Sequence, residues 1–129
     1  MEQTKKRILC VDDDRDTCLM LETLFGLSGY EVTSAMTIAD ASRLAKKGSF
    51  DLYLLDWIFS DGTGIELCQY IRMFDTKTPI LFCSGVAYEA DINRAMSAGA
   101  QGYLVKPTEI ENLIQTVRDC LPSDARSNI

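Results

Sequence analysis

The run FDLYLLD, residues 50–56, decides the fold class of this chain. It is mostly apolar and too short for a helix, so it predicts a strand that is buried on both faces of a parallel sheet. The strand ends in the carboxylate of Asp56, and turn-forming residues follow from Ser60 to Gly64. Open α/β sheets bind ligands at the carboxyl ends of their strands, which makes Asp56 a candidate functional residue. A lone aspartate here more often starts a loop or caps a helix, so the assignment depends on residues elsewhere.

Strand-like apolar runs alternate with helical patterns along the chain. The predicted strands are Lys6–Val11, Tyr30–Ala35, Phe50–Asp56, Pro79–Cys83 and Tyr103–Val105. The predicted helices are Asp16–Leu27, Thr37–Lys47, about Thr63–Met73, Tyr88–Ala98 and Glu109–Leu121. Five strands and five helices in alternation predict an α/β fold, a doubly wound parallel sheet with helices on both faces. The flavodoxin-like strand order 2-1-3-4-5 is the common one, and it makes the first and third strands neighbours.

Local signals mark several helix ends. Thr37 and Asp40 resemble a capping box at the start of the second helix, and Gly48 ends that helix. The first helix stops at Ser28 and Gly29. Length and pattern together predict one domain over residues 1–121, followed by a polar tail at 122–129.

Composition excludes several classes of function. The net charge is −6, which argues against a protein that binds nucleic acid directly. The chain has no histidine, which excludes Ser-His-Asp and Cys-His catalysis and the usual zinc ligands. No apolar run approaches the roughly 20 residues that span a bilayer, and the N-terminus does not resemble a signal peptide. Five cysteines without a CxxC pair are expected to be reduced and mostly buried, which indicates a cytoplasmic protein.

Four of the five predicted strands end in groups suited to a phosphoryl anion or a hard cation. These groups are Asp12 with Asp13, then Asp56, Ser84 and Lys106. Two carboxylates about 5 Å apart repel by roughly 1–3 kcal/mol at dielectrics between water and a protein surface, so a cation is expected among them. Mg²⁺ fits because it prefers oxygen ligands and completes its shell with water and phosphate oxygens. Lys106 adds one fixed positive charge, and the Ser84 hydroxyl adds a hydrogen-bond donor.

These residues lie in four motifs that resemble the receiver domain of two-component response regulators. The motifs are VDDD at residues 11–14, LLDW at 54–57, CSG at 83–85 and YLVKP at 103–107. The resemblance covers the chain to about Leu121, and the order and separation of the motifs make it specific. It implies the 2-1-3-4-5 fold, a requirement for Mg²⁺, and acceptance of a phosphoryl group from a histidine kinase onto an aspartate.

The resemblance also implies a role for each site residue. Asp56 matches the phosphoacceptor, Asp12 and Asp13 match the acidic pair that holds the metal, and the backbone carbonyl of Ile58 matches a further metal ligand. Lys106 matches the lysine that pairs with the phosphoryl oxygens, and the family usually holds the following bond to Pro107 in the cis form.

Two further positions match the residues that report phosphorylation. Ser84 matches the switch Ser/Thr, and Tyr103 matches the aromatic switch, which is expected to fill space that Ser84 vacates. The alternatives are that Ser84 only caps the next helix and that Tyr103 is an ordinary aromatic residue at a strand edge. Asp14 is expected to cap the first helix rather than bind metal.

The resemblance implies protein partners rather than a substrate. We expect a sensor histidine kinase or phosphotransfer protein as the donor and a downstream protein or domain as the output. The face formed by residues 88–98, 103–105 and 109–121 is the family's usual output and dimer surface. The chain is expected to catalyse only its own phosphorylation and dephosphorylation, and either to act through protein contacts or to come from a longer protein.

Two other classes of protein share features of this site or fold. A phosphohydrolase of the haloacid dehalogenase type also has a strand-end aspartate nucleophile, but needs a second aspartate where this chain has Ile58. A flavodoxin-like FMN carrier needs a phosphate loop where this chain has Asp12–Arg15, which would repel phosphate. The chain departs from the receiver pattern at Phe59-Ser60, where Met-Pro is usual, and we expect a less rigid loop there. It departs again at Gly85, and neither change removes a reacting group.

Overall fold

A five-stranded parallel sheet forms the centre of the computed structural model, which describes residues 5–121. The strands are β1 (Arg7–Val11), β2 (Glu31–Ala35), β3 (Leu52–Leu55), β6 (Ile80–Ser84) and β7 (Gly102–Val105), in the order β2-β1-β3-β6-β7. All four pairs of neighbouring strands are parallel. Counting only these five strands, the order is the predicted 2-1-3-4-5. The tail at 122–129 lies outside the described residues.

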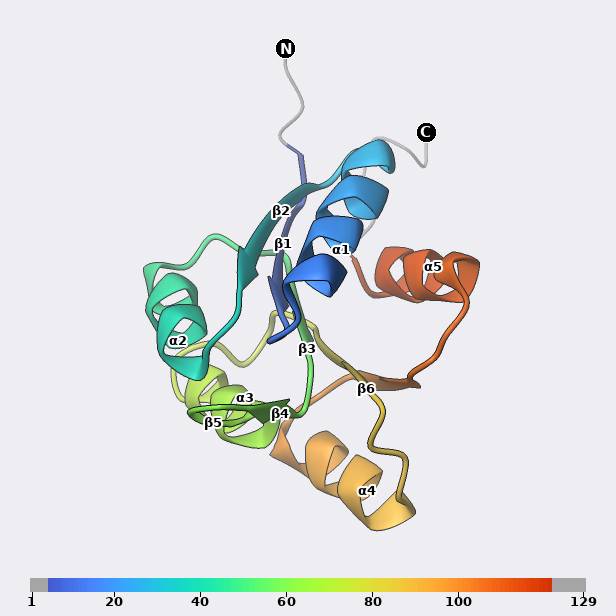
Figure 1. The fold of residues 1–129 in the computed structure, drawn as a ribbon. Helices are drawn as coiled ribbons and strands as arrows, with labels where there is room; N and C mark the ends of the chain where they lie inside the picture. Colours follow the sequence, from blue (N-terminus) through green and yellow to red (C-terminus); the bar gives the residue numbers. More distant parts are fainter. Residues whose placement is uncertain (1–4, 122–129) are drawn as a thin grey trace, which may run out of the picture.

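Within the described residues 5–121, five helices cover the two faces of the sheet (Figure 1). They are α1 (Arg15–Leu27), α2 (Ile38–Lys47), α3 (Gly64–Arg72), α4 (Glu89–Ala98) and α5 (Ile110–Cys120). Side chains alternate along each strand, so one face of the sheet packs against α1 and α5 and the other against α2, α3 and α4. The predicted three-layer α/β architecture is confirmed.

The central strand β3 is buried along its whole length, as its apolar sequence predicts. Its four residues are at most 3% exposed, because β1 and β6 flank it and helices cover both of its faces. Burial of this strand fixes the direction in which the chain leaves the sheet at Asp56. The acceptor candidate is therefore attached to the most enclosed element of the fold.

The helix ends confirm part of the predicted capping. Thr37 accepts a hydrogen bond from the Asp40 backbone N–H at the start of α2, and Gly48 closes that helix with φ +83°. The predicted capping box at this helix is wrong in its second half, because the Asp40 carboxylate accepts from Arg43 instead. A complete capping box lies at α3, where Thr63 and Glu66 bond reciprocally.

The sequence prediction missed a hairpin directly after Asp56. Strands β4 (Ile58–Phe59) and β5 (Gly62–Thr63) pair antiparallel, and Ser60 and Asp61 form the turn between them. Two-residue strands show no periodicity, so this stretch reads from sequence as an ordinary loop. None of the helices within residues 5–121 is long and apolar enough to cross a lipid bilayer.

Candidate functional site

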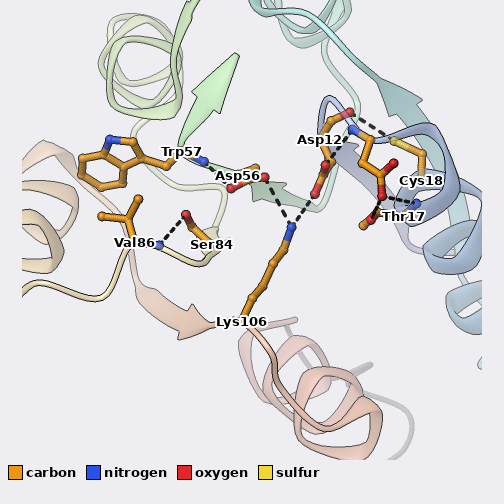
Figure 2. Close-up of polar contacts among 9 residues, drawn as sticks. Asp12, Thr17, Cys18, Asp56, Trp57, Ser84, Val86 and Lys106 are labelled. Carbon is orange, nitrogen blue, oxygen red and sulfur yellow. Dashed lines mark hydrogen bonds and ion pairs between the residues drawn. The ribbon is translucent and has the colours of Figure 1, made fainter.

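The carboxyl ends of β1, β3, β6 and β7 bring the predicted site residues together (Figure 2). Asp12 follows β1, Asp56 follows β3, Ser84 is the last residue of β6 and Lys106 follows β7. Parallel strands end at the same edge of a sheet, so four segments far apart in sequence converge there. The same order makes β1 and β3 neighbours, which is why the acidic residues meet.

Three carboxylates form a cluster at this edge. One oxygen each of Asp12, Asp13 and Asp56 lies within 4.8 Å of the other two. Asp12 is buried, Asp56 is half-buried and Asp13 is exposed, so the cluster opens to solvent on one side. Hard carboxylate oxygens at this spacing, with room for water, are the donor set that Mg²⁺ prefers. The residues therefore fit the metal that the sequence predicts.

Lys106 lies between the two less exposed carboxylates (Figure 2). Its Nζ is 2.7 Å from Asp12 Oδ2 and 3.3 Å from Asp56 Oδ2. Burial raises the pKa of Asp12, although donation from Lys106 counteracts the shift. Burial also lowers the pKa of Lys106, but the Asp12 and Asp56 carboxylates outweigh that effect and raise it overall. Lys106 therefore stays positively charged and offsets part of the repulsion in the cluster.

The loop after β1 is held by hydrogen bonds that fix Asp12. Its Oδ1 accepts from the Asp14 backbone N–H at 2.9 Å, and its carbonyl oxygen accepts from the Cys18 thiol at 3.3 Å. Asp14 caps α1, because its Oδ2 accepts from the backbone N–H and the hydroxyl of Thr17. The expectation that Asp14 is a cap is confirmed, and its carboxylate serves the helix rather than the acidic cluster.

Gly64 fits closely behind Asp56, whereas its sequence context marks it only as a turn-forming residue. A Cβ at this position would lie 2.1 Å from the Asp56 carbonyl oxygen and 2.9 Å from the Phe82 ring. The Gly64 N–H donates to the Trp57 carbonyl oxygen at 2.7 Å, and the Trp57 N–H donates to Asp56 Oδ1 at 2.7 Å. These contacts fix both the backbone and the carboxylate of Asp56. The available sequence signal for this close approach was a glycine at the end of the run of turn-forming residues.

Ser84 and Tyr103 both bond to the backbone of Val86. The Ser84 hydroxyl oxygen accepts from the Val86 N–H at 3.1 Å, and the Tyr103 hydroxyl donates to the Val86 carbonyl oxygen. The Tyr103 ring stacks on Phe82 with centroids 5.7 Å apart and also contacts Trp57. Tyr103 is therefore packed inward and is not an ordinary strand-edge aromatic residue, whereas its movement into space that Ser84 vacates stays a prediction.

Ile58, whose backbone carbonyl matches a metal ligand, and Gly85, which departs from the receiver pattern, are both exposed to solvent. The Ile58 side chain is 62% exposed, whereas its backbone belongs to the β4–β5 hairpin. Gly85 is exposed, and a Cβ there would meet no atom within 4 Å. The bond between Lys106 and Pro107 is cis, as the resemblance implies.

A pocket of about 370 Å³ opens between α1 and α5 and reaches the site. Asp12, Asp56 and Lys106 line it together with apolar residues of both helices, among them Met20 and Ile110. The Asp56 carboxylate therefore lines a pocket that is otherwise mostly apolar. The sequence gives no signal of this pocket, because it depends on how α5 packs beside α1.

Comparisons with known proteins agree with this geometry. Residues 8–118 match the family model of the response regulator receiver domain. The nisin biosynthesis regulatory protein NisR of Lactococcus lactis is 31% identical over 94% of this chain and 52% of its own length. The transcriptional regulatory protein PrrA of Mycobacterium tuberculosis is 34% identical over 92% of this chain and 51% of its own length. This chain spans about half the length of these two relatives.

Solved structures are similar over nearly the whole fold. The chemotaxis response regulator CheY4 of Vibrio cholerae superposes with a TM-score of 0.86 at 31% identity, covering 92% of this chain and all of that one. A CheY-like receiver domain protein of Methanospirillum hungatei gives a TM-score of 0.87 at 27% identity, covering 90% of this chain and 93% of the other.

Proposed function

This chain belongs to the response regulator receiver family, and from that premise we propose that Asp56 accepts a phosphoryl group from a phosphohistidine of a sensor kinase or phosphotransfer protein. The observation that carries the proposal is the position of Asp56. Its carboxylate lies in one cluster with Asp12 and Asp13 and 3.3 Å from Lys106. A nucleophilic oxygen, a cation site and a fixed ammonium group thus converge at one strand end, which is the set that phosphoryl transfer needs.

The acidic cluster is the proposed site of Mg²⁺. Carboxylate oxygens of Asp12, Asp13 and Asp56 would hold the ion together with the backbone carbonyl of Ile58. When bound, Mg²⁺ supplies positive charge that neutralises the transferring phosphoryl group. The chain's own residues supply the rest of the site.

In the proposed transfer, an Asp56 carboxylate oxygen forms a bond to phosphorus as the bond from phosphorus to the donor's imidazole nitrogen breaks. The product is an acyl phosphate on Asp56 and a free histidine on the donor. The Lys106 ammonium group pairs with a phosphoryl oxygen, and the Ser84 hydroxyl donates to another. The protein thus catalyses only its own phosphorylation and dephosphorylation and turns over no metabolite.

The proposed output is a change in protein contacts. At present the Ser84 hydroxyl oxygen accepts a hydrogen bond from the Val86 N–H. If Ser84 donates to the phosphoryl group, its oxygen moves and this bond is lost. Val86 also holds Tyr103, so the change reaches the surface of α4, β7 and α5. That surface is the proposed site for a downstream partner or a second copy. We do not propose that this chain binds nucleic acid directly. We propose that it acts in the cytoplasm.

The proposal is tested by locating the phosphoryl group. Incubation with acetyl phosphate and Mg²⁺ is expected to add one phosphoryl group that hydroxylamine removes, because an acyl phosphate reacts with this nucleophile. Peptide mapping after borohydride reduction is expected to place the modification at Asp56. Labelling of a serine or threonine, stable to hydroxylamine, would contradict the assignment.

Removal of Asp13 tests the metal site. Mg²⁺ at 100 times its dissociation constant is expected to raise the free energy of unfolding of the wild type by about 2.7 kcal/mol. Asp13→Ala is expected to remove most of this increment, because the variant loses one ligand, while relief of repulsion raises its stability without metal. Denaturant melts with and without Mg²⁺ measure the increment.

Asp16→Ala serves as the control for this experiment. Asp16 is an exposed acid in the first turn of α1, and it lies outside the cluster. This variant is expected to keep the response of the wild type to Mg²⁺. An equal response in Asp13→Ala and the wild type would show that Asp13 is not a ligand.

A further inference from the structure

The turn of the β4–β5 hairpin is bonded to a helix from another part of the fold. Asp61 Oδ1 accepts from the Ile38 backbone N–H at 2.8 Å, and Asp61 Oδ2 accepts from the Ala39 backbone N–H at 3.0 Å. These donors lie in the first turn of α2, where backbone N–H groups have no partner within the helix. The two bonds lower the pKa of Asp61. The hairpin tip is thus attached to α2 by both oxygens of one carboxylate.

The base of the hairpin is held at α3. Thr63 ends β5 and forms the capping box with Glu66, and the next residue, Gly64, donates to the Trp57 carbonyl oxygen. Gly62 sits tightly between the two helices, since a Cβ there would lie 3.0 Å from Glu66 Oε1 and 3.3 Å from the Ile38 side chain. In Figure 1 the hairpin lies beside α3 and below α2. It is fixed at both ends.

The chain between these attachments carries part of the site. Trp57 and Ile58 follow Asp56 directly, and Ile58 pairs with Thr63 across the hairpin. The Ile58 side chain is largely exposed and contributes little to holding the strand. Ser60 in the turn lacks the fixed φ angle that a proline would impose. The position of the Ile58 backbone therefore depends on the hydrogen bonds at the hairpin tip and base.

We propose that Asp61 is a positioning residue for the phosphoacceptor site, because its bonds to α2 hold the hairpin whose first residue, Ile58, would offer its backbone carbonyl to the metal. The inference rests on the proposed function, since it assigns this carbonyl to the Mg²⁺ site. The expectation of a less rigid loop at Phe59-Ser60 stays a prediction, and the bonds of Asp61 add a constraint that it did not include. The constraint at this turn comes from a side chain that reaches across to another helix.

The competing explanation is that Asp61 only stabilises α2. A carboxylate at a helix N-terminus satisfies orphan N–H groups and interacts favourably with the helix dipole. Thr37 provides a matched comparison, because its hydroxyl caps the same helix by accepting from Asp40 N–H at 3.1 Å. Thr37 belongs to the chain that enters α2 and makes no bond to the hairpin among the described residues. Loss of either residue weakens the start of α2, but only loss of Asp61 frees the hairpin.

The experiment compares Asp61→Ala, Asp61→Asn and Thr37→Ala in a titration with Mg²⁺ alone. Trp57 is the only tryptophan and adjoins Asp56, so its fluorescence reports the site. Asp61→Ala is expected to raise the Mg²⁺ dissociation constant about tenfold, the low end of the range for groups that orient metal ligands. Thr37→Ala is expected to leave it unchanged. Asp61→Asn, which lacks the charge but keeps one acceptor oxygen, is expected to lie nearer the wild type than Asp61→Ala.

Hydrogen exchange supplies a second readout that needs no metal. The Gly64 N–H, which bonds Trp57 at the hairpin base, is expected to exchange faster in Asp61→Ala and at the wild-type rate in Thr37→Ala. Equal effects of Asp61→Ala and Thr37→Ala in both measurements would reduce Asp61 to a helix cap and overturn the inference. Equal weakening of Mg²⁺ binding in Asp61→Asn and Asp61→Ala would assign the effect to charge and also overturn it.

The two proposals fail in different ways. A wild type that neither binds Mg²⁺ nor takes a phosphoryl group overturns the proposed function. Slow Gly64 exchange that is lost only in the Asp61 variants would then still support Asp61 as the residue that holds the hairpin.

Discussion

Asp56→Asn is expected to abolish hydroxylamine-sensitive phosphorylation while leaving the fold intact. An amide oxygen can still accept from the Trp57 N–H, as Asp56 Oδ1 does at 2.7 Å. The amide is not a nucleophile toward phosphorus, so no acyl phosphate can form at this position. The variant loses the contact to Lys106 at 3.3 Å but also loses one of three mutually repelling carboxylates. Its free energy of unfolding is therefore expected to stay within about 1 kcal/mol of the wild type.

The measurement is mass spectrometry after incubation with acetyl phosphate and Mg²⁺, paired with a denaturant melt. Asp14→Asn is the matched control, because it makes the same chemical change two residues from Asp12. Asparagine is also a good N-cap, so α1 should keep its start and Asp56 should be phosphorylated normally. Labelling of Asp56→Asn at the wild-type level would place the phosphoryl group elsewhere and refute the proposed function.

The strands and the meeting of the acidic residues could be predicted because burial leaves a clear pattern in sequence. A strand enclosed on both faces needs consecutive apolar residues, and the runs in β1, β3 and β6 are unbroken until their polar ends. Once five such strands alternate with helices, few topologies remain. The common order places Asp12 beside Asp56 without any knowledge of side-chain positions.

The features that were missed depend on contacts between distant segments. The bonds from Ile38 and Ala39 to Asp61 join residues 22 and 23 positions apart, and no periodic pattern marks them. The inward position of Tyr103 depends on stacking with Phe82 and on a backbone carbonyl, neither of which residue type alone specifies. One missed feature was readable, because Thr63-x-x-Glu66 before an apolar run is a capping-box sequence.

Lys106 has two roles in this site. It lies beside Asp56, the proposed phosphoacceptor, and it compensates the buried charge of Asp12. Asp12 is 4% exposed, and its partners are the Lys106 ammonium group and the Asp14 backbone N–H. Burial already raises the pKa of Asp12 despite this donation. Without the ammonium group, the ionised form of Asp12 would be opposed by burial and by the nearby Asp56 carboxylate. Reactivity and stability should therefore change together when Lys106 is replaced.

Lys106→Met is expected to slow phosphorylation by acetyl phosphate about 10²-fold, since removal of one preorganised charge-stabilising group costs at least this much in other sites. It is also expected to lower the free energy of unfolding by about 2 kcal/mol at neutral pH. This value is below the usual cost of breaking a buried ion pair, because the Lys106 side chain in the pair with Asp12 is one third exposed. Methionine keeps an apolar stem against the pocket, so the loss reports the charge rather than packing.

The stability loss in Lys106→Met should depend on pH in a defined direction. A carboxyl group whose folded pKa is raised destabilises the fold only when ionised, so the penalty from Asp12 is absent at low pH and grows as pH rises through its folded pKa. Removal of Lys106 raises that pKa further. The difference in unfolding free energy between wild type and variant is therefore expected to be smaller near pH 4, about the ordinary aspartate pKa, than at neutral pH.

The double variant Asp12→Asn with Lys106→Met separates the two roles of the lysine. Asparagine removes the uncompensated charge but keeps an oxygen that can accept from the Asp14 N–H at the same position. Stability at neutral pH should then recover most of the loss, whereas phosphorylation should remain slow because neither the ammonium group nor the Asp12 carboxylate is restored. Denaturant melts at both pH values and the rate of phosphoryl incorporation measure the two effects. A stability loss that is equal at both pH values, or that persists in the double variant, would show that Lys106 supports the fold through packing rather than by neutralising Asp12.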